Sequence, residues 1–241
     1  MPLISLPFIV TSALVVNIIP NITEKSTLRR YKEIDNDIML AIKSTLIISI
    51  PLTLLFIILA KPISIFFYSD ILVSDIIRIM GFGTLVLSLQ HIYSGILYGL
   101  NKQFNVMKNN LIGLILRVVL LYVLVGNPKY GINGFYISFY TSELIIITLN
   151  VLALKRLVSL KFDYWDLVGK PIIGSLFMIT LLYLSSYNLE DLHYANSLAF
   201  VSSIFVALFS YLFILIVTKN QHIQKNKRIL ATVFFYMKIL Q

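Results

Sequence analysis

The stretch LIGLILRVVLLYVL, residues 111–124, decides the fold of this chain. Thirteen of its fourteen residues are apolar or small, and its only charge is that of Arg117. A guanidinium inside such a run needs polar partners, and which partners it can find depends on the solvent around the helix. The composition of the whole chain identifies that solvent.

Residues of the AVILMFWYC set make up 58% of the 241 residues, whereas soluble domains reach about 45–50% even with Gly counted. Charged residues make up 13%, and the mean hydropathy is +0.87. A water-soluble fold of this size cannot bury so much apolar surface, so the composition indicates an integral membrane protein. The absence of cysteine excludes disulfides and thiolate metal sites.

The hydrophobic pattern predicts an all-α polytopic membrane helix bundle, because a spanning helix needs about 20 mostly apolar residues. Seven segments of a transmembrane domain (residues 1–218) qualify: 2–22, 41–67, 76–100, 104–126, 131–154, 168–187 and 194–218. The basic tail, residues 219–241, ends in an apolar stretch too short to span, which favours an interfacial helix.

The net charge of +9 is distributed between the hydrophobic blocks, which favours a membrane topology signal over nucleic-acid binding. Sixteen of the 20 Lys and Arg residues lie after the first, third and fifth segments and in the tail, and three lie on the other side. Basic loops face the cytoplasm, so we expect a plasma-membrane protein with a cytoplasmic C-terminus and an outside N-terminus.

The first segment is weak, since it contains Pro7, Asn17 and Pro20 and no basic residue precedes it. It is typical of an internal helix that enters the membrane together with an earlier one. We therefore expect the chain to lack an N-terminal portion, which a separate half or a second copy of the chain would replace.

Four stretches carry a family resemblance: SGILYGLNKQFNVMKNNLIGLILR (94–117), LPFIVTSALVVNIIPNITE (6–24), GNPKYGINGFYIS (126–138) and TLNVLALKR (148–156). In this order and spacing they resemble the multidrug/oligosaccharidyl-lipid/polysaccharide exporter superfamily. The branch they resemble most is that of stage V sporulation protein B and polysaccharide biosynthesis. A basic residue occupies the position of Arg117 in that pattern, whereas Glu143 does not belong to it.

The resemblance implies a flippase that moves a lipid-linked saccharide or related amphiphile outward, in cell-wall or spore-envelope synthesis. Its cavity lies between two six-helix lobes, of which this chain covers the C-terminal one without its first helix. The alternative is a fragment that does not transport without an N-terminal partner. The resemblance implies no cofactor, and an ion gradient or the membrane potential would drive transport.

Arg117 and Glu143 lie at similar depths on neighbouring segments, differing by about 4–5 Å at 1.5 Å per residue. A charge at the centre of a span faces protein or a wet cavity. The pair is therefore either a buried bridge that holds a helical hairpin together, or part of a cavity wall that attracts an anionic diphosphate or couples to an ion.

The third segment carries a second candidate. His91, Ser94, Gly95 and Tyr98 follow helical spacing, and Gln90 lies beside them. Either they line a polar cavity or they are satisfied in tight packing, which Gly95 and Gly99 favour as a Gly-x-x-x-Gly pair. Asn17, Asn110 and Asn150 are expected to cap helices or to bond between them. The three His residues are too scattered to predict a metal site.

An enzyme hypothesis rests on Asp35-Asn36-Asp37, which we expect in a cytoplasmic loop after the first segment. Glycosyltransferases use such an Asp-x-Asp pair to hold a metal and a nucleotide sugar. The motif is common in proteins, and the surrounding loop contains many residues of both charge signs, which is typical of a solvated loop.

The basic cytoplasmic face has a different expected partner, namely the head groups of membrane lipids.

The charge asymmetry predicts that residues 23–40 are cytoplasmic and residues 187–193 are outside. In this cysteine-free background, an impermeant thiol reagent applied to intact cells should label Asn188→Cys and not Lys32→Cys. The reverse labelling pattern would overturn the orientation.

Overall fold

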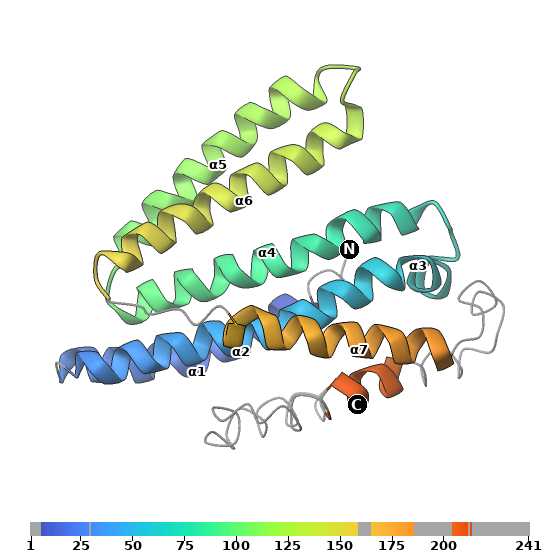
Figure 1. Cartoon of the computed structure of the whole chain (residues 1–241). Helices are drawn as coiled ribbons and strands as arrows, with labels where there is room; N and C mark the ends of the chain where they lie inside the picture. Colours follow the sequence, from blue (N-terminus) through green and yellow to red (C-terminus); the bar gives the residue numbers. More distant parts are fainter. Residues whose placement is uncertain (1–5, 29, 159–164, 186–203, 212, 214–241) are drawn as a thin grey trace. The chain divides into compact units, whose positions relative to one another are not determined.

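The computed structural model describes residues 6–28, 30–158, 165–185, 204–211 and 213. Within these residues the chain is helical and has no strand (Figure 1). The helices are α1 (Leu6–Thr27), α2 (Tyr31–Ile58), α3 (Ala60–Tyr68), α4 (Val73–Gly99), α5 (Gln103–Val125), α6 (Gly131–Lys155), the π-helical turn η2 (Trp165–Gly169) and α7 (Lys170–Ser185). Residues 204–211 are also helical.

Five of the described helical segments are long and apolar enough to cross a membrane: Glu33–Ile58, Val73–Gly99, Gln103–Val125, Gly131–Lys155 and Trp165–Leu184. Lipid offers no hydrogen bonds to the backbone, so helices that satisfy their own N–H and C=O groups are the stable form of such segments. The all-α polytopic bundle expected from the sequence is confirmed. Most of the expected segment 194–218 and the whole tail 219–241 lie outside the described residues.

Two sequence expectations about segment limits are wrong. The expected span 41–67 is split at Leu59, between α2 and α3. Pro62 explains the break, because it has no N–H for the carbonyl of Ile58 and its ring crowds that carbonyl. The expected loop 23–40 is almost entirely helical, since α1 continues to Thr27 and α2 begins at Tyr31.

The C-terminal end of α1 and the N-terminal end of α2 are stabilised as helices by ion pairs between them. The Nζ atom of Lys25 on α1 lies 2.7 Å from Oδ2 of Asp37 and 3.7 Å from Oε2 of Glu33, both on α2. Glu33 also lies in the first turn of α2, where a negative charge is favourable. A hydropathy pattern registers these residues only as polar, which is why it predicts a loop there.

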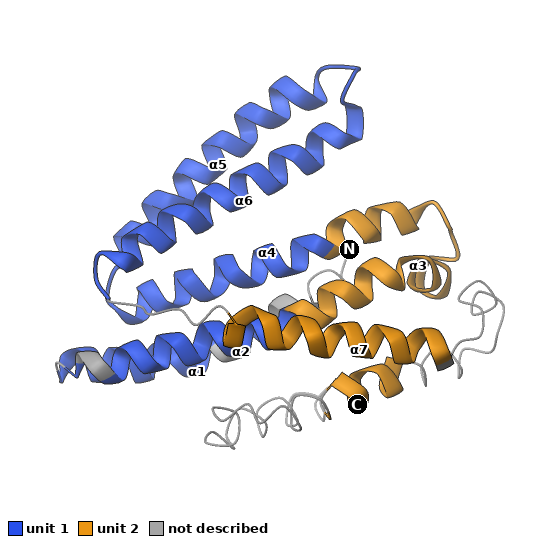
Figure 2. Cartoon of the chain, in the orientation of Figure 1, with its two compact units in different colours: residues 1–49, 82–162 blue, residues 50–81, 163–241 orange. Residues whose placement is uncertain are grey.

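The structure divides into two compact units (Figure 2). The first unit contains residues 1–49 and 82–162, and thus α1, α5, α6 and parts of α2 and α4. The second contains residues 50–81 and 163–241, with α3, η2, α7 and the remaining parts of α2 and α4. In the second unit α4 approaches α2 closely, because a Cβ on Gly81 would lie 3.0 Å from Cβ of Phe56.

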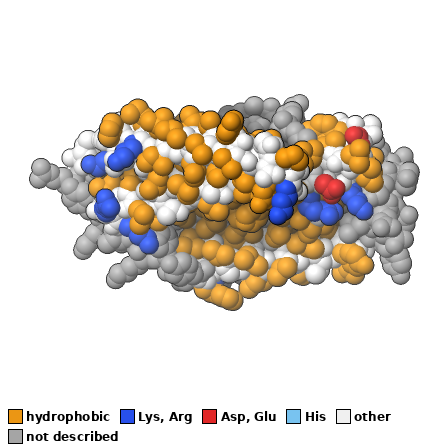
Figure 3. Space-filling view, turned by 90° about the horizontal axis from the view of Figure 1, so that it is seen from above, with side chains coloured by type: hydrophobic (Ala, Val, Ile, Leu, Met, Phe, Trp, Pro, Cys, Tyr) orange, Lys and Arg blue, Asp and Glu red, His pale blue; other side chains and the backbone are white. Residues whose placement is uncertain are grey.

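The outer surface is apolar where a soluble protein would be polar. On α5 the side chains of Leu114, Ile115, Val118 and Tyr122 are more than half exposed. Hydrophobic side chains are spread over the described part of the face in Figure 3. An apolar face of this kind on a helix of spanning length is suited to lipid rather than to water.

Helices α5 and α6 form an antiparallel hairpin, and three of its contacts are spaced four residues apart on each helix. Asn109 bonds to Asn150, Gly113 lies against Ile146, Arg117 bonds to Ser142, and Gly134 lies against the backbone of Leu124. On α6 the seam contains the small residues Gly134, Ser138 and Ser142, all buried. Small residues four apart let two helices approach closely in a membrane, so this seam fixes the register of the hairpin.

Gly134→Ala is expected to destabilise the hairpin by about 1–3 kcal/mol, the typical cost of overpacking. The added Cβ would lie 2.8 Å from the carbonyl carbon of Leu124, and a backbone atom cannot turn away. Thermal unfolding in detergent measures the loss.

Gly113→Ala is the matched control. Its Cβ would lie 2.2 Å from Cγ1 of Ile146. This clash is with a side chain, so a second substitution that shortens Ile146 can relieve it. Adding Ile146→Ala should therefore remove the cost of the Gly113 change and leave the cost of the Gly134 change intact. Equal rescue of both would show that the backbone contact does not limit the packing.

Candidate functional site

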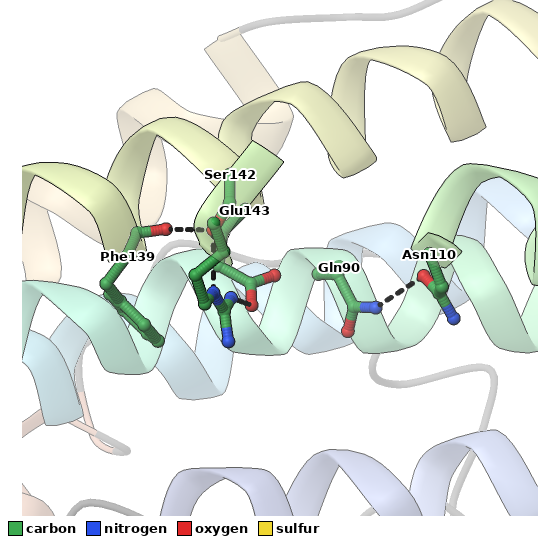
Figure 4. A network of polar contacts seen from close by, with 6 residues as sticks. Gln90, Asn110, Phe139, Ser142 and Glu143 are labelled. Carbon is green, nitrogen blue, oxygen red and sulfur yellow. Dashed lines mark hydrogen bonds and ion pairs between the residues drawn. The ribbon is translucent and has the colours of Figure 1, made fainter. Parts of the chain in front are cut away.

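Arg117 is bound on three sides by residues of α6 (Figure 4). Its Nε donates to Oγ of Ser142 at 2.8 Å, and its Nη2 forms an ion pair with Oε1 of Glu143. Its Cζ lies 5.1 Å from the centroid of the Phe139 ring, within the range of a cation–π contact. The structure thus confirms Glu143 as the ion-pair partner of Arg117.

The spacing of residues on α6 creates this receptor. Phe139, Ser142 and Glu143 lie at positions i, i+3 and i+4, which share one face of a helix. Ser142 is fixed by donating its own hydroxyl proton to the carbonyl oxygen of Phe139 at 2.8 Å, so its oxygen lone pair remains for Arg117. The ring, the hydroxyl and the carboxylate therefore converge on one guanidinium.

These contacts explain how an apolar helix carries a cation. Placing Arg at the centre of a span costs about 2.5–3.5 kcal/mol on insertion scales, and a charge-assisted hydrogen bond is worth about 1.5–3 kcal/mol. Two such bonds and an aromatic face are enough to offset that cost. The ion pair stabilises the hairpin whether or not it also serves a cavity, and the cavity role of Arg117 stays a prediction.

Arg117 and Glu143 differ in the exposure of their side chains and in how many of their polar atoms form hydrogen bonds. The side chain of Arg117 is 29% exposed, whereas that of Glu143 is 7% exposed. One carboxylate oxygen of Glu143 binds Arg117, and the other, Oε2, is buried and accepts no hydrogen bond from the described residues. The Arg117 side chain is therefore partly accessible, and one oxygen of the Glu143 carboxylate has no hydrogen bond within the described part of the chain.

A second polar network joins α4, α5 and α6. Nδ2 of Asn109 donates to Oδ1 of Asn150 at 2.8 Å, and Nδ2 of Asn150 donates to Oγ of Ser94 at 3.1 Å. Nε2 of Gln90 donates to Oδ1 of Asn110 at the long distance of 3.4 Å. The expected bonding of Asn150 between helices is confirmed, and Gln90 is held by a neighbour.

Asn109 is a participant that the sequence analysis missed. It is buried at the seam, eight residues before Arg117 and four before Gly113. That spacing places all three on one face of α5, and it is the signal that would have distinguished Asn109 from its neighbour Asn110.

The structure divides the candidate stripe on α4. Gly95 and Gly99 face α1, where added Cβ atoms would lie 2.5 Å from Cγ1 of Val15 and 3.0 Å from Cβ of Ile22. These close approaches are what the expected packing role of the two glycines requires. Ser94 instead bonds to α6, as described above. His91 is partly exposed and Tyr98 is 40% exposed.

The Asp-x-Asp pair does not lie in a loop, as expected, but inside α2. Two residues apart on a helix, at about 100° per residue, Asp35 and Asp37 point to nearly opposite sides. Asp37 is engaged by Lys25. No cluster of three or more potential metal ligands occurs among the residues that the structure describes.

Comparison with protein-family models places the chain in a known family. A family model described as "Lipid II flippase MurJ" matches residues 3–201 of the 241. No curated protein and no solved structure matches the chain. The superfamily resemblance expected from the sequence is thereby confirmed, and the match covers every polar contact described for the hairpin.

The ion pair predicts a specific pattern of stabilities. Arg117→Leu leaves a buried carboxylate, and Glu143→Leu leaves a guanidinium without its counter-charge, so each should cost about 3–5 kcal/mol. The double Leu variant should be more stable than either single variant, because replacing both charges is often neutral.

Unfolding of the four proteins in detergent measures the coupling energy. Ser142→Ala is the matched control, since it removes one hydrogen bond and no charge. Additive losses in the Arg117 and Glu143 variants would show that the ion pair does not contribute to stability.

Proposed function

This chain belongs to the lipid II flippase MurJ family, and we propose that it moves a diphosphate-linked lipid saccharide outward across the cell membrane. A flippase transfers a lipid between leaflets and makes or breaks no bond in it, so the chain is a membrane transporter rather than an enzyme. The glycosyltransferase hypothesis is therefore set aside, in line with the helical, ion-paired position of Asp37.

The physical difficulty of this transport lies in the head group. The lipid tail can remain in the bilayer, but a charged diphosphate and its sugars must pass a hydrocarbon core about 30 Å thick. A protein lowers this barrier by supplying a cation at depth, because an anion paired with a cation is far less costly to hold in apolar surroundings. Ionisable residues within spanning segments commonly mark such pathways.

Arg117 is the observation that supports this proposal. It lies inside the spanning helix α5, and 29% of its side chain is exposed. A guanidinium presents a planar set of N–H donors that matches phosphate oxygens. We propose that its exposed edge faces the transport cavity and contacts the diphosphate, whereas Ser142 and Phe139 hold the guanidinium in place.

The direction of transport is proposed from the charge asymmetry of the sequence. With the basic segments on the cytoplasmic side, the substrate enters from the leaflet in which cells make lipid-linked precursors, and leaves outside. Peptidoglycan precursors and polysaccharide or spore-envelope precursors share the diphosphate, so Arg117 would serve either kind of head group.

The proposal predicts that proteoliposomes carrying the chain, with whatever partner co-purifies from its own membrane, flip a fluorescent lipid-linked saccharide. An impermeant quencher added outside measures the transfer. Arg117→Lys should keep part of the rate, because the charge remains and the planar donor set is lost. Arg117→Leu should reduce the rate at least tenfold, the change that about 1.4 kcal/mol produces.

Lys108→Gln is the matched control, since it removes an exposed cation from the same helix. It should flip at the wild-type rate. Arg117→Leu with unchanged flipping, or a wild-type protein that transfers no lipid-linked saccharide, would contradict the proposal.

A further inference from the structure

The ion pair between Arg117 and Glu143 uses less than its full bonding capacity. A carboxylate and a guanidinium can form two parallel hydrogen bonds, which is the strongest arrangement. Here the donors of Arg117 are divided between two acceptors, Nε going to Ser142 and Nη2 to one oxygen of Glu143. The second oxygen of Glu143 remains without a hydrogen bond among the described residues.

The unused capacity lies on both sides of the pair. No described residue takes a hydrogen bond from Nη1 of Arg117, and the side chain is partly exposed. An anion could therefore approach Arg117 without first removing Ser142 or Phe139. The contact in direct competition with such an anion is that of Glu143.

We propose that Glu143 is an internal substitute for substrate: it occupies Arg117 when no substrate is bound, and a diphosphate head group displaces it. This inference rests on the proposed function. Phosphate oxygens can accept two hydrogen bonds from the guanidinium at once, whereas Glu143 accepts through one oxygen. The incoming anion therefore gains the stronger arrangement.

The displaced carboxylate explains why the head group leaves again. Glu143 is buried, and a buried carboxylate without a cation is unfavourable. Its tendency to return to Arg117 weakens substrate binding and promotes release. A flippase needs this property, because an anion held tightly at mid-membrane would stay there.

The test is Glu143→Gln, which keeps the size of the side chain and removes the competing charge. Because a hydrogen bond to a charged group is at stake, the Kd for a lipid-linked diphosphate saccharide should fall about 10- to 100-fold. The KM of flipping should fall with it, and kcat should also fall because release becomes slow. A merely structural role for Glu143 would weaken binding instead.

Two control variants bracket this result. Glu143→Asp keeps the competing charge on a shorter side chain, so its Kd should lie between those of the wild type and of Glu143→Gln. Ser142→Ala removes a neutral partner of Arg117 and should not tighten binding. Tightening by Ser142→Ala as large as that by Glu143→Gln would overturn the proposal, because charge competition would not be its cause.

Binding is measured for three ligands, to identify which phosphate group Arg117 recognises. They are the lipid-linked diphosphate saccharide, inorganic pyrophosphate, and vesicles containing phosphatidylglycerol. Tighter binding of the two diphosphates by Glu143→Gln supports the exchange. Tightening for phosphatidylglycerol alone would overturn it in favour of bulk lipid head groups. An unchanged Kd, with wild-type flipping intact, overturns the exchange and leaves the proposed function standing; absence of both binding and flipping in the wild type overturns both.

A measurement on the wild type covers the case in which Glu143→Gln fails to fold. A membrane-permeant carbodiimide modifies accessible carboxyl groups, and mass spectrometry locates the product. Saturating lipid-linked diphosphate saccharide should increase modification at Glu143 several-fold, because the carboxylate has left Arg117. Unchanged or reduced modification would overturn the displacement.

Discussion

The contact on which this structure depends is the one between a guanidinium and a single face of the neighbouring helix. Arg117 lies in an apolar spanning segment, where it needs polar partners at its own depth. Ser142 and Glu143 supply them, and only one alignment of α5 against α6 brings both within reach. A shift of the hairpin by one turn would leave a charge on each helix facing hydrocarbon.

The rest of the seam is compatible with this alignment and reinforces it. Helix association in lipid has little hydrophobic driving force, so it relies on close packing and on hydrogen bonds. Gly113 and Gly134 allow the backbones to approach above and below the ion pair, and Asn109 and Asn150 bond at one end. The network then continues to Ser94 on α4, which ties the hairpin into the first unit.

Hydropathy and charge were sufficient to predict the helical membrane class, the hairpin and the Arg117–Glu143 pair, because these follow from segment length and depth. Features that depend on helix rotation were not predictable in this way. Asn109 and Asn110 are adjacent, and only the direction of α5 decides which one reaches Asn150. The break at Leu59 and the helical continuation through Asp35-Asn36-Asp37 depend on local backbone and ion-pair geometry that a hydropathy window does not register.

The proposed double role of the pair, in stability and in transport, depends on the unequal exposure of its two members. If both side chains were fully buried and doubly bonded, the pair would be a permanent bridge. If both were exposed, water would weaken the attraction and the site would not discriminate between anions. The observed pair matches neither case, because the side chain of Arg117 is 29% exposed and that of Glu143 is 7% exposed. In the proposed exchange, the buried carboxylate keeps the cation in place between transport cycles, and the partly exposed Arg117 side chain remains open to a stronger acceptor.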